Sequence, residues 1–197
     1  MNKDYQTLIH SWMNENRVVG IELLQKLVRN RSIQTNEYEA QQVIINHLQK
    51  LDLEIDEWEV TGDIFTHPYF CSTRKSFLNS PNVVGVKRGI GKGKSIILNG
   101  HIDVVPEGDV TQWTDDPYSG KIEGGKMYGR GTTDMKGGTV SLLLAIQALK
   151  ELGIQLDGDV IFQSVIEEES GGAGTLGTLL RGYKADAAII PEPTNMK

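Results

Sequence analysis

The chain has 197 residues, which is enough for one domain with a sizeable hydrophobic core. Its hydrophobic and charged fractions, 39% and 23%, are ordinary for a globular protein. The formal net charge of −6 argues against binding to nucleic acids or anionic membranes, because both favour a basic protein surface. We therefore expect neither kind of partner.

Cysteine content and hydropathy bear on the compartment. Cys71 is the only cysteine, so no intrachain disulfide can form, which indicates a reducing environment. The first residues lead into no apolar signal core, and no run approaches the ~20 apolar residues that span a bilayer. We expect a cytoplasmic protein.

The first 80 residues carry helical patterns and then an irregular stretch. Apolar residues at three-to-four spacing predict a helix over residues 5–30. Asn36 is predicted to cap a second helix, with Glu39 completing a capping box. A strand is predicted near residues 53–60. Residues 61–80 show no period and predict a long loop, of a kind that is often functional or mobile.

The second half alternates between strand and helix patterns. Residues 82–87 and 95–99 are predicted to be strands joined into a hairpin by a turn rich in glycine and lysine. The predicted elements that follow are a helix over 137–152, a strand over 159–166, a short helix over 174–181 and a buried strand over 187–190. This order predicts an α/β fold, with a mostly parallel sheet sandwiched by helices (α/β/α) and the hairpin as an addition.

Two partial nucleotide-binding motifs are incomplete. Gly93-Lys94-Ser95 resembles the end of a P-loop, but Arg88 occupies the place of the first glycine and a strand follows instead of a helix. Gly129-Arg130-Gly131 begins a dinucleotide fingerprint, but Asp134 occupies the place of its third glycine. We therefore predict no nucleotide site.

Three apolar runs end in groups that bind metals. The groups are His101 and Asp103, Glu167–Glu169, and Glu192, and a glycine-rich stretch centred on Asp134 lies between them in the chain. Imidazole and carboxylate groups gathered at strand ends suit Zn²⁺, Co²⁺ or Mn²⁺. The pattern predicts the metal-binding part of a hydrolase.

Each of these residues also has an ordinary structural explanation. His101 alone is more often a structural histidine, but Asp103 lies two residues further on the same face of a strand, where its carboxylate can hold the other ring nitrogen. Asp134 can serve as a turn residue that caps the next helix. We favour a metal role because the flanking glycines permit unusual backbone geometry near a ligand.

The acidic triplet gives the strongest indication. Three consecutive carboxylates at a sheet end repel one another without a cation, although a solvated acidic loop is the alternative. Glu168 and Glu169 point in different directions, so one can bind metal while the other reaches an activated water. Glu192 lies between two prolines, which suits a rigid metal ligand, although it can also be an ordinary turn carboxylate.

These motifs resemble one family of enzymes. The stretches His-Ile-Asp-Val-Val-Pro106, Gly-Arg-Gly-Thr-Thr-Asp-Met-Lys-Gly-Gly138, Glu-Glu-Glu-Ser-Gly-Gly-Ala-Gly174 and Pro-Glu-Pro193 follow in family order and spacing. The family is that of the zinc-dependent amidohydrolases, which includes aminoacylase, acetylornithine deacetylase, succinyl-diaminopimelate desuccinylase and carboxypeptidase G. The first 80 residues agree with it in pattern only.

The resemblance implies a role for each residue. Asp134 would bridge two metal ions, His101 and Glu192 would complete one site, and Glu169 would serve the other. The family motif usually reads Asp-Glu-Glu-x-Gly, and Glu167 replaces its aspartate. Glu168 is then the general base. The family also often has a cis peptide after the bridging aspartate.

The resemblance also implies parts that these residues do not include. The family's second metal takes a histidine from a C-terminal segment, and a lid domain contributes substrate contacts and dimerisation. None of His10, His47 and His67 matches that ligand. We expect residues 1–197 to be the N-terminal part of a catalytic domain, without the lid and the C-terminal segment.

The function predicted is that of a dizinc amidohydrolase acting on small N-acylated amino acids or related amides. Asp103 would support catalysis by orienting His101. The full-length protein is a candidate homodimer. The alternatives are a dipeptidase or carboxypeptidase, a formamide deformylase acting on a different amine, a non-catalytic metal-binding module, and a folding unit with no activity by itself.

Overall fold

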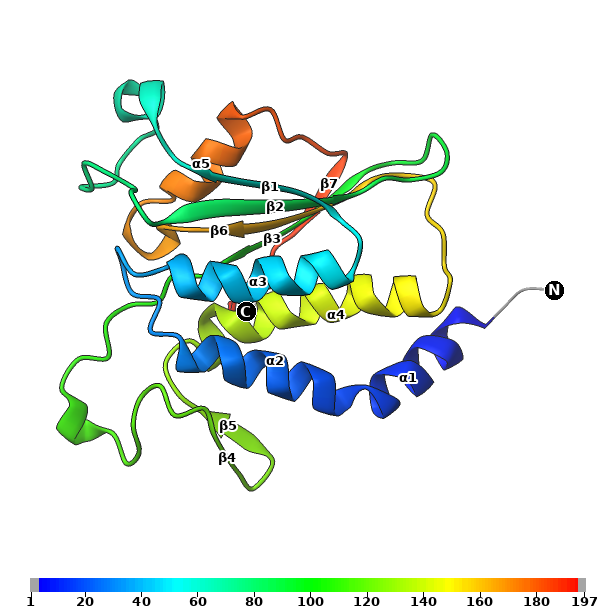
Figure 1. Ribbon diagram of the computed structural model, residues 1–197, viewed down its shortest axis with the longest axis horizontal. Helices are drawn as coiled ribbons and strands as arrows, with labels where there is room; N and C mark the ends of the chain where they lie inside the picture. The colour runs from blue at the N-terminus through cyan, green and yellow to red at the C-terminus, as the bar shows by residue number, and fades with distance from the viewer. Residues whose placement is uncertain (1–3, 195–197) are drawn as a thin grey trace.

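A mixed five-stranded sheet lies at the centre of the computed structural model, which describes residues 4–194 (Figure 1). The strand order is β1-β2-β6-β3-β7. The strands span Glu54–Glu59 (β1), Pro81–Lys87 (β2), Ile96–His101 (β3), Val160–Val165 (β6) and Ala187–Ile189 (β7).

Most strands of this sheet point the same way. Strand β3 is parallel to β6 and to β7, whereas β2 is antiparallel to β1 and to β6. Strand β1 therefore runs in the direction of β6, so that β1, β6, β3 and β7 share one direction and β2 opposes them. The predicted mostly parallel α/β sheet is confirmed.

Helices cover both faces of the sheet, but unequally. The helices span Tyr5–Glu15 (α1), Arg17–Arg29 (α2), Tyr38–Lys50 (α3), Gly137–Glu151 (α4) and Ala173–Leu180 (α5). Figure 1 shows α2, α3 and α4 on one face and α5 on the other. Helix α4 connects the parallel strands β3 and β6, as a crossover between parallel strands requires. No helix within residues 4–194 is long and apolar enough to cross a membrane.

The main core lies between the sheet and helices α2–α4. Its buried side chains include Leu27, Ile44, Leu48, Leu143, Ile146, Val83 and Phe162. Burying each such side chain stabilises the fold by ~1.5–3 kcal/mol. On the opposite face a smaller cluster joins Val84, Val86 and Ile161, and Tyr183 stacks on Trp58.

The prediction of a buried strand near the end of the chain was wrong. Strand β7 is exposed along its length, and Ile189 keeps 48% of its surface accessible. It is one of the two edge strands of the sheet and, within residues 4–194, pairs with β3 alone. Its apolar sequence predicted a buried strand. The strand is exposed because no segment within residues 4–194 covers it.

The predicted hairpin of residues 82–87 and 95–99 was also wrong. Strand β6 lies between β2 and β3 and pairs with both. The turn after β2 is held instead by the segment before β6, where Asp159 Oδ1 accepts the Gly89 N–H at 2.8 Å and the Asp157 carbonyl accepts the Gly91 N–H at 3.1 Å. The two strands therefore separate and admit β6 between them.

The helix boundaries near Asn16 and Asn36 differ from the prediction. The helix predicted over residues 5–30 is two helices, because Asn16 ends α1 and its amide donates to the Trp12 carbonyl at 2.9 Å. Helix α3 begins at Tyr38, and the Asn36 amide donates backwards to the Arg31 carbonyl at 2.6 Å. The predicted capping box at Asn36 was therefore wrong.

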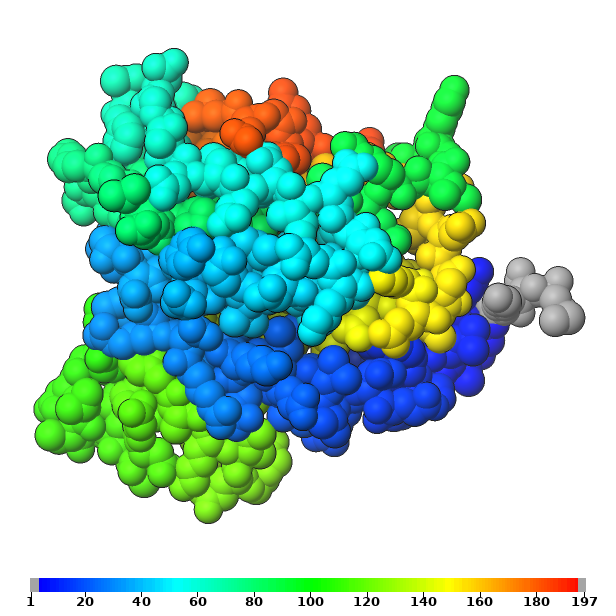
Figure 2. All heavy atoms as spheres, in the orientation of Figure 1, coloured from blue at the N-terminus to red at the C-terminus, as the bar shows by residue number. Residues whose placement is uncertain are grey.

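A separate hairpin is an element that we did not predict. Strands β4 (Lys121–Glu123) and β5 (Lys126–Tyr128) flank Gly124 and Gly125, whose φ angles are +58° and +78°. Two central residues with positive φ favour a tight hairpin turn, so the Gly-Gly pair was an available signal. Residues 104–130 form a lobe beside α2 (Figure 2), where the Gln25 amide donates to the Gly120 carbonyl at 2.8 Å.

Candidate metal centre

The centre of the site is His101, the last residue of β3, whose side chain is buried. Its Nδ1 lies 2.8 Å from the main-chain carbonyl of Asp103, which can only accept a hydrogen bond. Nδ1 is therefore the donor, and the neutral ring presents the lone pair of Nε2. Nε2 faces Asp134 Oδ1 at 3.1 Å, Glu192 Oε1 at 3.6 Å and Glu168 Oε2 at 3.8 Å. The structure thus brings these predicted residues together.

A tight turn presents Asp134 to His101. Gly131 has a φ of +80°, and a Cβ atom there would lie 2.6 Å from Val104 Cγ1. Only glycine fits both requirements. The Asp134–Met135 peptide is cis, as the family resemblance implied. Asp134 does not cap the next helix: α4 starts at Gly137 without a side-chain cap.

Asp103 contacts more of the site than predicted, and differently. Its carboxylate was expected to bind the His101 ring, but its Oδ1 lies 3.6 Å from Nδ1 and the main-chain carbonyl makes the closer contact. The two carboxylate oxygens instead accept the N–H groups of Glu168 at 3.2 Å and Glu169 at 3.1 Å. One residue therefore orients both the imidazole and the acidic turn.

The distances suit a transition metal. One ligand atom each from His101, Asp134 and Glu169 lies within 4.8 Å of the others. Zinc bonds of ~2.0–2.1 Å in a tetrahedron separate ligand atoms by about 3.3 Å. The distances from His101 Nε2 to Asp134 and Glu192 fall close to that value. The imidazole and carboxylate donors therefore fit zinc in both chemistry and spacing.

Electrostatics favour a cation at this place. Burial favours the neutral His101 ring, but Asp103 and Glu192 outweigh it and raise the pKa of His101 to about 10. Burial together with Asp134 raises the pKa of Glu192 to about 7, and burial and Asp134 also raise the pKa of Glu169. Protons are thus held where carboxylates crowd together, and a metal ion can replace them.

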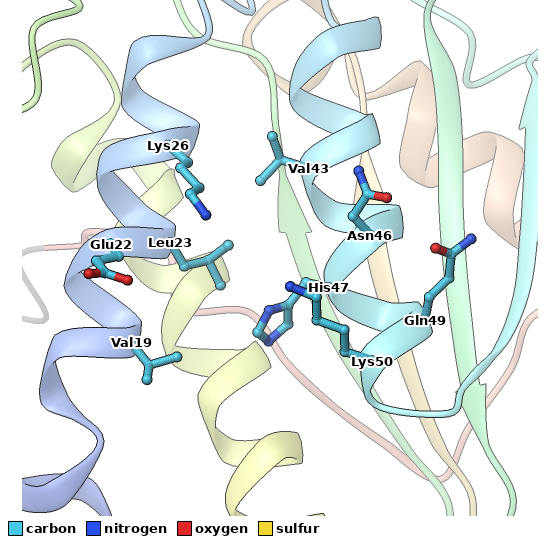
Figure 3. Close-up of a pocket in the computed structure, with 9 residues that line it drawn as sticks. All are labelled: Val19, Glu22, Leu23, Lys26, Val43, Asn46, His47, Gln49 and Lys50. Carbon is cyan, nitrogen blue, oxygen red and sulfur yellow. The ribbon is translucent and has the colours of Figure 1, made fainter.

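The other three histidines lie elsewhere. His10 is in α1, His47 in α3, and His67 follows the short turn Gly62–Thr66. His47 lines a groove of about 680 Å³ between α2 and α3, together with Lys26 and Lys50 (Figure 3). Burial lowers the pKa of His47. That groove does not share residues with the cluster around His101.

Some buried residues next to the site were missed. Lys136 is fully buried, and its Nζ donates to the carbonyls of Leu27 (2.8 Å) and Asn30 (2.9 Å) at the end of α2. Burial lowers the pKa of Lys136 to about 7. Arg74 and Glu37 form a buried ion pair that reaches Glu167. No sequence pattern marked them, because Arg74 lies in the aperiodic stretch and Glu37 beside a misplaced helix start.

Curated relatives of this chain are named as a deformylase and as desuccinylases. It is 39% identical over 162 residues to N-formyl-4-amino-5-aminomethyl-2-methylpyrimidine deformylase of Halalkalibacterium halodurans, covering 81% of this chain and 34% of that protein. It is 40% identical over 123 residues to succinyl-diaminopimelate desuccinylase of Methylobacterium nodulans, covering 59% of this chain and 31% of that protein. The chain thus spans about a third of the length of these relatives.

Solved structures and a family match agree with the fold. The di-peptidase Dug1p of Saccharomyces cerevisiae superposes with a TM-score of 0.77 at 20% identity, covering 94% of this chain and 40% of that one. Residues 97–197 match the family described as Peptidase family M20/M25/M40, and they include every candidate ligand named above. The chain therefore belongs to the M20/M25/M40 peptidase family, a family of hydrolases.

Proposed function

We propose that the whole protein is a metal-dependent amidohydrolase that cleaves the amide bond of a small N-acylated amine. The observation that carries the proposal is the convergence on His101 Nε2 of carboxylates from three separate segments. Glu168 is among them, with about half of its side chain exposed, so it can reach a water or a substrate. A module that only binds metal needs no such base.

The proposed ligands divide between two metal ions. His101, Asp134 and Glu192 would hold one, and Asp134 and Glu169 would begin the other. Zinc is the first choice, and Co²⁺ or Mn²⁺ also suits these donors. The second site is one ligand short within residues 4–194, and we propose that a histidine elsewhere in the full-length protein completes it.

The residues of this chain would divide the chemistry as follows. Zinc bound at the cluster would lower the pKa of a water molecule toward ~7 and stabilise negative charge on the amide oxygen. Glu168 takes the proton of the attacking water and returns it to the leaving nitrogen. Asp103 keeps Glu168 and Glu169 in place through their N–H groups and fixes the tautomer of His101.

The relatives suggest the class of substrate. The deformylase is 39% identical over 81% of this chain, whereas the desuccinylases are 40% identical over 59% of it or 31% identical over 88% of it. The combination of identity and coverage favours a small formamide as the first substrate to test. N-acylated amino acids are the second, and dipeptides the third. A cytoplasmic location and a homodimeric full-length protein belong to the same proposal.

The test uses the full-length protein. Metal content is measured by elemental analysis, and hydrolysis is assayed on N-formyl-aminomethylpyrimidine, N-succinyl-diaminopimelate and a dipeptide, before and after chelation. We expect amide hydrolysis that chelation abolishes and zinc restores. His101→Ala should lose metal and activity, whereas His10→Ala, at an exposed position on α1, should change neither. Activity that survives both chelation and His101→Ala would refute the proposal.

The isolated 197-residue chain provides a second test. Because its second site lacks a ligand, we expect it to bind at most one zinc tightly and to hydrolyse these amides negligibly. Calorimetric titration with zinc, with an activity assay alongside, measures both. Two tight sites or full activity would mean that the missing ligand lies within these residues.

A further inference from the structure

The first residue of the acidic triplet points away from the metal centre. Glu167 is 1% exposed, and its carboxylate accepts hydrogen bonds from the Gln34 amide at 3.0 Å, from the Ser72 hydroxyl and from Arg74 Nη1 at 3.0 Å. It therefore anchors the acidic turn in the protein interior, while Glu168 and Glu169 face the site.

Arg74 is the centre of this anchor. Its Nη1 also donates to Glu37 Oε1 at 2.8 Å, its Nη2 donates to the Ser80 hydroxyl at 2.8 Å, and its guanidinium lies over the Phe77 ring at 4.7 Å. A planar guanidinium can serve these partners at once, whereas an ammonium on a flexible stem cannot hold the same directions. Arg74 thus ties the aperiodic stretch to the acidic turn.

The backbone of the turn depends on that anchor. Glu167 has a φ of +62°, in the left-handed region that non-glycine residues rarely adopt, and holding it there has an energetic cost. Gly171, at the end of the same turn, packs closely on residues 71–72, as shown by the 2.9 Å that would separate a Cβ atom at Gly171 from the Ser72 nitrogen. Packing against the aperiodic stretch and the hydrogen bonds to Glu167 together hold the unusual conformation.

The turn is therefore held from two sides. Glu167 is bound on the interior side by Arg74, and the next two N–H groups are bound by Asp103 on the side of the metal centre. Those two attachments fix where Glu168 and Glu169 point. Without Arg74, Glu37 and Glu167 would be two buried carboxylates without their shared cation.

We propose that Arg74 is a positioning residue of the metal centre, which acts through Glu167 to set the directions of Glu168 and Glu169. The predicted effect of Arg74 on turnover rests on the proposed function. Its predicted effect on zinc affinity does not, because zinc binding can be measured without a substrate. The stretch 61–80 thereby supports the metal centre indirectly, and none of its side chains lies among the proposed metal ligands.

The test is Arg74→Lys in the full-length holoenzyme, with Arg181→Lys as the matched control. Arg181 also binds a carboxylate, Asp56, and lies over an aromatic ring, Trp58, but these partners belong to the edge strand β1 and not to the acidic triplet, and Arg181 is partly exposed. For Arg74→Lys we expect kcat to fall by ~10–100-fold with KM within about threefold, and zinc affinity to fall by a similar factor. Arg181→Lys should keep wild-type kcat, KM and zinc affinity.

Unchanged kcat and zinc affinity in Arg74→Lys, or an equal loss in Arg181→Lys, would overturn the proposal. If Arg74→Lys does not fold, the double variant Arg74→Met/Glu167→Gln removes one positive and one negative charge together; the same loss of kcat is expected, and wild-type kcat would overturn the role. If the wild-type protein hydrolyses no amide, the proposed function fails, and zinc titration of the same variants still decides the positioning role.

Discussion

The two ends of the central sheet differ in how their charged groups are paired and how far they are exposed to water. At the amino-terminal end, Arg88 bridges Glu54 at 3.0 Å and Asp159 at 2.9 Å, and 62% of its side chain is exposed. The turn that follows projects from the body of the molecule (Figure 2). At the carboxyl-terminal end, the buried His101 faces three carboxylates within 3.8 Å.

The difference lies in charge balance and solvent. Exposed pairs at the first end already contain their cation, and water screens them, so they contribute little to stability. The second end has an excess of carboxylates around one imidazole, partly withdrawn from water, which raises the pKa of Glu169 and Glu192. Of these two ends, the second is the one left in need of a cation, and for this reason the proposed metal site lies there.

Glu168→Gln in the full-length protein, at the carboxyl-terminal end of the sheet, should produce the largest effect. It removes the proposed base but no proposed metal ligand, so we expect turnover to fall by at least ~100-fold with metal content close to wild type. Steady-state kinetics and elemental analysis measure the two quantities. Glu39→Gln, at an exposed position on α3, is the control. Loss of metal with retained turnover per bound metal would exchange the roles of Glu168 and Glu169.

Asp103→Asn should have the next largest effect. An amide in place of the carboxylate sets a donor against the N–H of Glu168 or Glu169, so the turn loses one of two attachments. We expect zinc affinity to fall by ~10–100-fold. Asp109 also accepts a backbone N–H, that of Thr111, but at an exposed turn, so Asp109→Asn should leave zinc affinity unchanged. Wild-type affinity in Asp103→Asn would mean that the turn is held without it.

The zinc affinity of the cluster around His101 should depend on pH. The pKa of His101 is raised to about 10 and that of Glu192 to about 7, so at neutral pH His101 is protonated and Glu192 is partly protonated, and zinc must displace these protons. Affinity should therefore rise with pH, by ~10-fold per unit for each proton released, and level off as pH passes the pKa of His101. Calorimetry in buffers of different ionisation enthalpy counts the protons. Binding that releases none would contradict the protonated cluster.

Arg88→Met should have the smallest effect, because it acts at the opposite end. It removes two exposed ion pairs, and we expect Tm to change by no more than about 2 °C and zinc affinity not at all. Thermal unfolding and zinc titration give both values. A change in zinc affinity as large as that of Asp103→Asn would mean that the two ends of the sheet are coupled.

The sequence by itself determined several of the elements and the donor types of the candidate site. Apolar periodicity predicted α3, α4, β2 and β6 to within a few residues, because those segments bury one face of a helix or both faces of a strand. The donor types at strand ends predicted the cluster of His101, Asp134, Glu168, Glu169 and Glu192.

The tertiary structure alone decided how strands pair and how the site is supported. The insertion of β6 between β2 and β3 arises from contacts distant in the chain, which a local pattern cannot encode. The same reason applies to Arg74, which lies 93 residues before Glu167 and in a stretch without periodicity. Asp103 shows the limit most clearly. The spacing of the two residues predicted that Asp103 lies close to His101. The hydrogen bonds that its carboxylate accepts from the N–H groups of Glu168 and Glu169 form only because the end of β3 lies beside a turn distant in the chain.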